Sequence, residues 1–537
     1  MKTAKRGLTG IIAASLLLAA ACSNESGSPQ ESGAGTGGDT AGTASAAAST
    51  AAASADGEGI QPINDGKPVK LVVNLGEYNP SLNEEATAEQ PVVFRSTQLL
   101  ADKFMELHPN VTIEWDRSSP ASGSDYIEGI NQWMTPRLAA GTAMDVASNL
   151  AGAAVFGNNG WFLDLESYLD QPNPYAEGNG KWSELWPDYQ WSASGVKNIK
   201  GETLGLPFMV SAGPPTAYYY NKEIFAELNL ETPKTWEEFI NVSKTINDAG
   251  YIAVAPFPGN KSMDLQVWDT QFSLGPAFGL AIMDEIDTNK DGALDSLERL
   301  QAVKEGYYDP SKHDNAMEIW RQVKRKYTEV LQKGYESTDY EPLWQEGKVA
   351  MLEDGLWRLP NELANTKRTF DFGMIPPPVI TKETTPLVGD ISFTEKGPYQ
   401  PAPANYFSVL SSSVEAHGPG TKEAAIAFIQ FLSVPENMSL IVLEKKGAVL
   451  GSVRGVAVPP ELDDWLNNSF PILPNISWLP ASEPEGRKNA NKTFEQWMKN
   501  MISDDEFAEQ LNKYSQQDAD QVIKSQNIDT SGWNLSN

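Results

Sequence analysis

The chain has few of the residues on which several classes of protein depend. Its 537 residues include one cysteine and three histidines. A single cysteine excludes an intrachain disulfide, and the histidines, His108, His313 and His417, lack the spacing of a zinc site. Zinc chemistry, and catalysis by a cysteine in the body of the chain, are therefore not expected.

Positive charge is also scarce. The 41 lysines and arginines face 71 aspartates and glutamates, which gives a formal net charge of -30 and a pI of about 4.5. A surface of this sign repels a phosphate backbone and anionic lipid headgroups. We therefore expect no nucleic-acid partner, and most of these carboxylates are best interpreted as solvated surface groups.

Long apolar runs are absent after residue 21. Lys2, Lys5 and Arg6 precede the apolar run LTGIIAASLLLAAA, an order typical of a secretory signal peptide. No later stretch reaches the roughly 18 consecutive apolar residues of a membrane-spanning helix. Residues 1–21 are therefore interpreted as a signal peptide, with no further segment that crosses a membrane.

The single cysteine, Cys22, follows this apolar run directly. The stretch LLLAAAC resembles the lipobox of bacterial lipoproteins, in which the cysteine becomes the lipid-bearing N-terminus, although Ala19 stands where leucine is commonest. The rest of residues 22–60 is rich in Ser, Gly, Ala and Thr without apolar periodicity, so it predicts a disordered tether. We expect a body that is lipid-anchored on the extracellular face of the cell membrane.

The remaining chain alternates strand and helix patterns. The run VKLVVNL from Val69 predicts a buried strand, apolar residues at helical spacing follow as far as Leu107, and VTIEW from Val111 predicts a second strand. This order is typical of a parallel sheet covered by helices. Stiff segments at residues 213–215 and in the run IPPP are places where the chain can pass between two lobes.

Several longer motifs resemble the extracellular solute-binding proteins of ABC importers, of the maltose-binding type. They are LPFMVSAGPPTAYYYNKEIFAELNLETPKTWEEF, WQEGKVAMLEDGLW, IPPP and TKEAAIAFIQFLSVPE, with AAGTAMDV and GWFLDLESYL nearer the N-terminus. The resemblance covers about residues 69–526. Within the family, the chain is most similar to the large lipoproteins of Bacillus and Paenibacillus type and to the alginate-oligosaccharide binders.

This resemblance implies an α/β, two-lobed fold of the type II periplasmic-binding-protein class, with a hinged cleft between the lobes. It also implies a monomer that captures an oligosaccharide and delivers it to the permease subunits of an ABC transporter, without chemical change and with only its lipid in the membrane. The expected lobes are residues 61–213 with 376–440 (N-terminal) and 214–375 with 441–537 (C-terminal).

The segment DTNKDGALDSLE, residues 287–298, has the pattern of an EF-hand calcium loop. Such a loop supplies oxygen ligands from positions 1, 3, 5, 7, 9 and 12 and has glycine at position 6 for the bend. Gly292 occupies the bend, and Leu294 is expected to anchor the loop in the core. The expected ligands of Ca²⁺ are the side chains of Asp287, Asn289, Asp291, Asp295 and Glu298 and the carbonyl of Ala293.

The resemblance places this loop in the lobe where the lipoprotein and alginate-binding relatives carry a calcium site. A single loop outside the cell stays occupied, so we expect calcium to stabilise its lobe, whereas calcium sensors usually pair their loops. The alternative interpretation is a solvated acidic turn.

Aromatic side chains are the expected sugar contacts, because an indole face stacks on the C–H side of a pyranose, although most aromatic residues belong to a core. Trp357 ranks first, since it occupies the aromatic position of the GxW turn that stacks on a sugar in the maltose-binding relatives. Asp354 and Arg358 flank it and are predicted either to bind hydroxyls or to form a surface pair.

Three further aromatic residues rank below Trp357. Trp268 and Trp478 lie in loop-like contexts, and Tyr218 shares a strand face with Tyr220 near the predicted hinge. The resemblance also places Pro214 where maltose-binding relatives have an acidic ligand contact, so maltose itself is not the expected ligand.

Two other functions fit parts of the sequence. A secreted glycosidase needs two carboxylates that flank a sugar bond, and no motif among the 71 acids selects such a pair. A calcium-dependent adhesion module of the dockerin sort repeats its loop, whereas this chain has the loop once. A binding protein that is not an enzyme is therefore the favoured function.

Overall fold

The structure is a computed structural model. It describes residues 60–83, 85–87, 92–120, 126–148, 156–193, 195–214, 216–256, 268–292, 294–398, 403–473 and 484–535. Cys22, the predicted signal peptide and all but the last residue of the predicted tether lie outside the described residues, as do Trp478 and Ala293.

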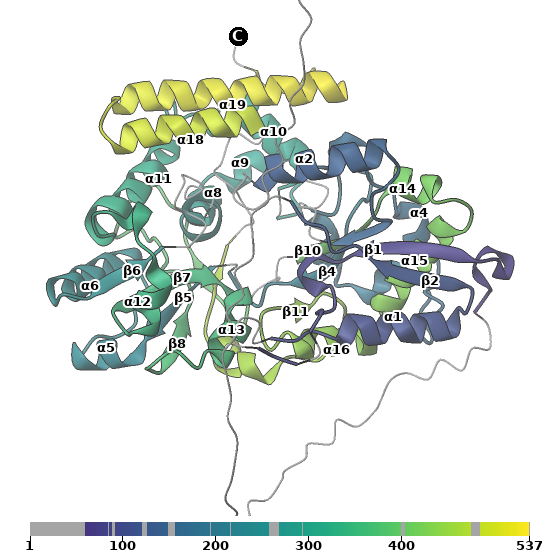
Figure 1. Cartoon of the computed structure of the whole chain (residues 1–537). Helices are drawn as coiled ribbons and strands as arrows, with labels where there is room; N and C mark the ends of the chain where they lie inside the picture. Colours follow the sequence, from purple (N-terminus) through teal and green to yellow (C-terminus); the bar gives the residue numbers. More distant parts are fainter. Residues whose placement is uncertain are drawn as a thin grey trace, which may run out of the picture. The chain divides into compact units, whose positions relative to one another are not determined.

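A six-stranded sheet organises the first lobe (Figure 1). Its strand order is β11-β4-β10-β3-β1-β2, in which β1 is parallel to β2 and β3, whereas β10 is antiparallel to β3 and β4. The strands are β1 (Val69–Asn74), β2 (Val111–Trp115), β3 (Val146–Ser148), β4 (Leu206–Val210), β10 (Pro403–Val409) and β11 (Leu450–Gly451).

Alternation along β1 divides the apolar residues of this lobe between two faces. Leu71 and Val73 belong to the larger core, whereas Val72 packs against a second cluster that contains Ile130 and Met134 of α2. Successive side chains of a strand point to opposite faces, so both faces of the sheet are covered. The helices of this lobe are α1 (Ser96–Leu107), α2 (Tyr126–Ala139), α4 (Glu166–Leu169), α14 (Ser411–Ala416), α15 (Thr421–Leu432) and α16 (Pro435–Glu444).

No single helix among the described residues is long and apolar enough to cross a membrane. Only α15 and α16 taken together reach that length and composition, and they are bent by 71° at the break between them. Both helices contribute apolar side chains to the larger core of the first lobe.

A four-stranded sheet organises the second lobe. Its order is β6-β7-β5-β8, with β6 parallel to β7 and β5 antiparallel to both neighbours. Tyr218 of β5 packs in the larger core of this lobe, whereas Ala217 and Tyr219 pack in a smaller core on the other face. The strands are β5 (Thr216–Asn221), β6 (Ile252–Ala255), β7 (Val349–Gly355) and β8 (Phe372–Ile375).

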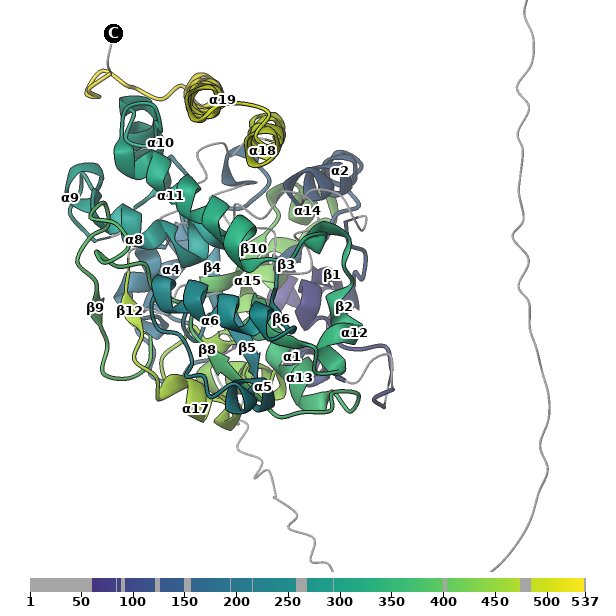
Figure 2. The same cartoon turned by 90° about the vertical axis from the view of Figure 1, so that its left-hand side faces the viewer.

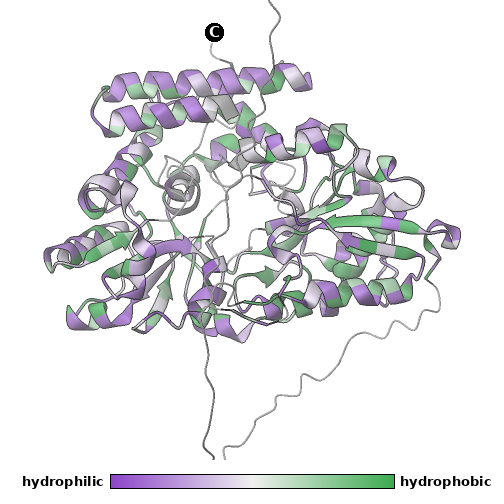
Figure 3. Cartoon of the chain, viewed as in Figure 1, coloured by the Kyte–Doolittle hydropathy of each residue, from purple (hydrophilic) through white to green (hydrophobic). Residues whose placement is uncertain are grey.

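Helices from distant parts of the chain cover this sheet. The last two, α18 and α19, lie side by side in both views (Figures 1 and 2) and are mostly hydrophilic along their length (Figure 3). The helices are α5 (Lys222–Glu227), α6 (Trp236–Asp248), α8 (Gly275–Leu280), α9 (Met283–Ile286), α10 (Ser296–Glu305), α11 (Asp314–Arg325), α12 (Tyr340–Gln345), α13 (Leu359–Ala364), α17 (Asp463–Leu466), α18 (Pro484–Met498) and α19 (Asp504–Gln526), with π-helical turns η7 (Trp268–Ser273) and η8 (Lys326–Val330).

Local sequence signals predicted several element boundaries correctly. The spacing of Thr235 and Glu238 predicts a capping box, and the structure contains it: the Thr235 side chain accepts a hydrogen bond from the N–H of Glu238, whose carboxylate accepts one from the N–H of Thr235. The run TAYYYN predicts a strand that turns into a helix at Asn221, and Asn221 caps α5 in the structure. Leu99 belongs to the apolar residues at helical spacing and is expected on the inward face of α1, but it is 47% exposed.

The lobe boundaries differ from the predicted ones near residues 376 and 441, the two later points at which the chain is expected to change lobe. Residues 376–398 do not join the first lobe, because Ile380 and Val388 pack in the larger core of the second. Hydrogen bonds between Val379 and the start of α6 hold the segment there. The proline run is stiff, but it lies along the same lobe and does not cross.

The chain also leaves the first lobe for the last time later than predicted. Residues 441–453 were assigned to the C-terminal lobe, but Ile441, Val449 and Val453 pack in the larger core of the first lobe, and β11 pairs with β4. The described strands therefore place three crossings between the lobes: from β4 to β5, from β9 (Ser392–Phe393) to β10, and after β11.

The first crossing is packed tightly against α17. Trp465 donates a hydrogen bond from Nε1 to the carbonyl of Ala212 at 2.9 Å. A Cβ atom on Gly213 would lie 2.9 Å from the Phe470 ring and 3.2 Å from Trp465 Nε1. Glycine is therefore required here by the close approach of the two rings.

We predict that Gly213→Ala destabilises the protein by about 1–3 kcal/mol, because the added methyl group overpacks this contact. Chemical denaturation of the purified protein measures the effect. Gly532→Ala is the matched control, since a Cβ there meets no atom within 4 Å; equal stability of the two variants would contradict the packing argument.

Candidate ligand-binding site

The carboxyl end of β7 lies beside the point where the chain enters the second lobe. Gly355, the last residue of β7, is paired with Thr216, the first residue of β5. Ligands of open α/β folds bind beyond the carboxyl ends of strands. The turn that follows β7, residues 355–358, is therefore well placed to meet a ligand held between the lobes.

Trp357 is the exposed aromatic residue of this turn. It is 44% exposed, whereas its neighbours Leu356 and Leu359 are buried. The indole lies against the backbone of Gly355 so closely that a Cβ at that position would clash with three of its ring carbons. The protein thus supports the ring on one side, and the exposed part is a flat apolar surface of the kind on which a sugar ring stacks.

Asp354 holds the same turn from its buried side. Its carboxylate accepts hydrogen bonds from the N–H of Gly355 at 2.7 Å, from Arg358 at 3.4 Å and from the Trp357 side chain. Burial raises the pKa of Asp354 to about 6, and Arg358 and these hydrogen bonds offset part of that effect. Both Asp354 oxygens are thereby engaged within the protein.

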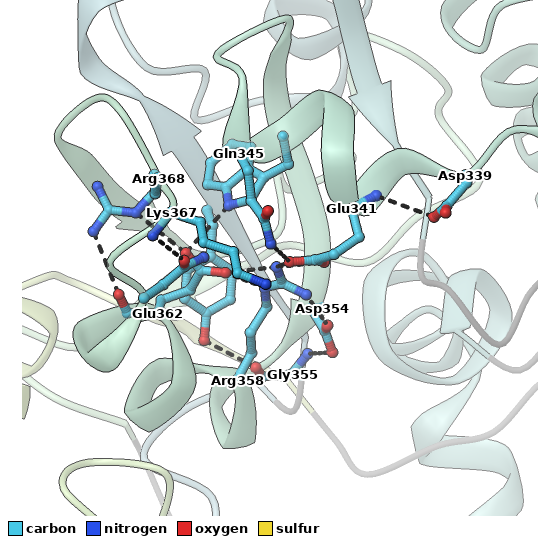
Figure 4. Close-up of polar contacts among 12 residues, drawn as sticks. Asp339, Glu341, Gln345, Asp354, Gly355, Arg358, Glu362, Lys367 and Arg368 are labelled. Carbon is cyan, nitrogen blue, oxygen red and sulfur yellow. Dashed lines mark hydrogen bonds and ion pairs between the residues drawn. The ribbon is translucent and has the colours of Figure 1, made fainter. Parts of the chain in front are cut away.

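Arg358 joins the turn to α12 and α13 (Figure 4). Its Nη2 lies 2.9 Å from Glu341 Oε2, and its Nε donates to Glu362 Oε1 at 2.7 Å. The Arg358 side chain is only 11% exposed. Asp354 and Arg358 are therefore paired, but the pair is buried and not at the surface as the second predicted role had it. Whether Asp354 or Arg358 touches a ligand stays a prediction.

Of the other predicted sugar contacts, the structure describes only the side chain of Tyr218. Tyr218 is 1% exposed, donates a hydrogen bond to Glu353 Oε1 at 3.0 Å and packs on the ring of Phe239. The structure therefore places Tyr218 in the core, because alternation along β5 turns this face inward. Trp268 begins the turn η7, and the structure does not describe its side chain.

The predicted calcium loop connects α9 to α10. Leu294 is 3% exposed in the core, as expected, and Gly292 has a φ of 82° at the bend. Asp295 caps α10 by accepting hydrogen bonds from the N–H groups of Leu297 and Glu298, both at 2.8 Å. The loop therefore has a bend at position 6 and a helix N-cap at position 9.

Two acids of the loop bind its own backbone. Glu298 Oε1 accepts hydrogen bonds from the N–H groups of Thr288 and Asn289 at 2.8 and 3.0 Å, and Asp287 accepts one from Gly292 at 2.9 Å. Among the described residues, no three His, Cys, Asp or Glu side chains converge closely enough to hold a metal. The all-oxygen donor set suits Ca²⁺, and Asp287 and Glu298 are buried, but calcium binding stays a prediction.

The sequence reasoning missed a buried ionic cluster next to the Trp357 turn. Lys326 is 0% exposed, and its Nζ lies 2.7 Å from Asp269 Oδ1 and 2.8 Å from Glu353 Oε1. The detectable signal was the pair Glu353-Asp354 inside the apolar run VAMLEDG, since buried carboxylates require donors or cations. Nothing in the run KRKY marked its lysine as buried.

Comparison with solved structures shows the fold. A chitin oligosaccharide binding protein matches with a TM-score of 0.57 and 17% identity over 84% of this chain and 99% of that chain. A structure from work on xylan utilization by Caldanaerobius polysaccharolyticus matches with a TM-score of 0.55 and 16% identity over 83% and 99%. An ABC substrate-binding protein from Listeria monocytogenes in complex with cycloalternan matches with a TM-score of 0.52 and 15% identity over 86% and 100%.

These likenesses confirm the predicted α/β, type II periplasmic-binding-protein-like fold. No curated protein has a matching sequence. The family model of the bacterial extracellular solute-binding proteins, however, matches residues 87–439, which is more than half of the chain. The chain therefore belongs to the family of bacterial extracellular solute-binding proteins.

Proposed function

We propose that this protein captures an oligosaccharide outside the cell and delivers it unchanged to the permease of an ABC transporter. Family membership supports extracellular solute binding, and similar structures include proteins that bind chitin oligosaccharide and cycloalternan. The observation that carries the carbohydrate class is Trp357, whose exposed indole is held against the Gly355 backbone. A fixed aromatic surface suits the C–H face of a sugar ring.

The carboxylates beside Trp357 support binding without catalysis. Hydrolysis of a glycosidic bond requires two carboxyl groups that reach the scissile bond from either side. Asp354 and Glu362 are 5% and 1% exposed and both contact Arg358, so neither is free to act as acid or nucleophile. Incubation of the purified protein with the bound oligosaccharide should therefore leave the sugar intact, in contrast to a secreted glycosidase.

The mode of attachment is part of the same proposal. The lipobox-like LLLAAAC supports a lipid on Cys22, and the Ser/Gly/Ala/Thr-rich segment supports a tether that holds a monomeric body near the permease. The single calcium-type loop argues against an adhesion module, which would repeat it.

We also propose that residues 287–298 bind Ca²⁺ as a structural ion. Asp287 and Glu298 are buried acids of the loop, and Asn289, Asp291, Asp295 and the carbonyl of Ala293 would complete an oxygen ligand set. Glu298 now accepts hydrogen bonds from backbone N–H groups of the loop. Calcium binding would require its carboxylate to turn away from these groups toward the centre of the loop. An ion bound only in the folded lobe would stabilise that lobe by mass action.

Trp357→Ala should weaken oligosaccharide binding roughly 10- to 100-fold, because burial of an aromatic side chain contributes about 1.5–3 kcal/mol. A thermal-shift screen of chitin-, xylan- and glucan-derived oligosaccharides selects the ligand, and isothermal titration calorimetry measures its Kd. Phe393→Ala removes another exposed aromatic residue, 53% exposed, and should leave Kd unchanged. An unaltered Kd in Trp357→Ala would reject this site.

Removal of calcium with a chelator should lower the melting temperature by roughly 5–15 °C while ligand affinity changes little. Glu298→Gln should abolish the dependence of the melting temperature on calcium. Asp284→Asn, an exposed acid just outside the loop, is the control and should retain it. A melting curve that chelator does not shift would refute the calcium proposal.

Asp354 should make stability depend on pH. Its pKa in the folded protein, about 6, lies above the usual carboxyl value, so the folded state binds the proton more tightly than the unfolded state. Its contribution is therefore fully present below about pH 4 and is lost as the pH rises through 6, by about 1–3 kcal/mol. In denaturation at pH 5 and pH 7, Asp354→Asn should show a smaller difference in unfolding free energy than the parent protein; an equal difference would contradict this assignment.

A further inference from the structure

Five buried side chains form one ionic cluster in the second lobe, which we name the Lys326 cluster: Lys326, Asp269, Glu353, Tyr218 and Tyr327. Lys326 Nζ donates to Asp269 Oδ1 at 2.7 Å and to both Glu353 oxygens at 2.8 and 2.9 Å. Tyr218 donates to Glu353, and Tyr327 donates to Asp269, both at 3.0 Å. None of the five is more than 6% exposed.

Stability alone does not account for this cluster. Removing charges from water costs several kcal/mol per ion, and apolar replacements of buried ion pairs are often neutral or stabilising. Here one ammonium group faces two carboxylates. Burial and, to a smaller extent, the nearby negative charge of Glu353 raise the pKa of Asp269 to about 6, while Lys326 offsets part of the effect. The second negative charge is therefore costly to keep in the core. A cluster of this kind is better explained by the geometry that it specifies.

The cluster joins the elements that carry the predicted ligand contacts. Asp269 lies in the π-helical turn η7 directly after Trp268, and Glu353 lies on β7 directly before Asp354, which supports Trp357. Lys326 opens a second π-helical turn, η8. Such turns are rare and occur frequently at functional sites. Lys326 thus bonds directly both to η7 and to β7, the strand that leads into the Trp357 turn.

We propose that Lys326 is a positioning residue for ligand binding: by binding Asp269 and Glu353 together, it fixes η7 against β7 and so sets the place of Trp268 relative to Trp357. This inference rests on the proposed function, because it requires an oligosaccharide to bind at Trp357. Lys326 itself is fully buried and does not touch the ligand. It acts through the two segments that its ammonium group holds.

The central test neutralises the cluster without changing its size. The triple variant Lys326→Met, Asp269→Asn, Glu353→Gln removes all three charges, so no unpaired ion remains in the core. It should melt cooperatively, yet its Kd for the oligosaccharide selected by the thermal-shift screen should rise at least 10-fold. Lys333→Met, an exposed lysine in the turn after η8, is the control and should keep the Kd of the parent protein.

A double-mutant cycle separates positioning from general destabilisation. The cycle compares the fold-increase in Kd that Trp357→Ala causes in the triple variant with the fold-increase that it causes in the parent protein. If the Lys326 cluster acts by placing η7 against the Trp357 turn, the fold-increase should be at least three times smaller in the triple variant. Additive effects on Kd, or an unchanged Kd in the folded triple variant, would overturn the proposal. Absence of oligosaccharide binding by the parent protein would instead reject the proposed function.

A milder variant keeps the test decisive if the triple variant does not fold. Asp269→Asn retains the side-chain size and the Lys326–Glu353 pair, and it removes only the negative charge through which η7 binds the Lys326 ammonium group. Its Kd should rise at least threefold. A folded Asp269→Asn variant with the Kd of the parent protein would overturn the proposal, whatever its melting temperature.

Discussion

The constraint on which the second lobe depends is the burial of two adjacent acids on one strand. Every residue of β7 is buried, including Glu353 and Asp354. Successive side chains of a strand point to opposite faces, and each acid accordingly finds a different cation, Lys326 for Glu353 and Arg358 for Asp354. The two ion pairs tie the end of β7 to helices on both sides of the sheet. The exposed indole of Trp357 therefore stands on a turn that is fixed from both faces.

The fixed contacts within a lobe contrast with the three crossings described above, at each of which a single segment of the chain joins the two lobes. A solute-binding protein must hold its ligand contacts at fixed places within each lobe, and preorganised contacts bind more tightly because less order is lost on binding. Closure of the lobes around a ligand would have to take place at these crossings. At the first of them, Ala212 and Gly213 pack so closely against Trp465 and Phe470 that movement must involve α17 as well.

Local order was predictable from the sequence, and long-range order was not. The capping box at Thr235 and the bend at Gly292 need only a few neighbouring residues, and the GxW motif was sufficient to rank Trp357 first. The Lys326 cluster, in contrast, joins residues 57 and 27 positions apart. Alternation showed that Tyr218 and Tyr220 share a face, but it does not say which face is covered, and the proline run marked stiffness without showing which lobe it follows.

The packing of α18 and α19 has a consequence for how the chain acquires its structure after synthesis. The larger core of the second lobe, which contains Trp236 and Trp320, also contains four side chains of the C-terminal helices: Phe494, Trp497, Phe507 and Leu511. This core is therefore incomplete until α18 and α19 have been synthesised. The first lobe likewise waits for α15 and α16. The second lobe therefore cannot reach its final packing before synthesis of the chain is nearly complete.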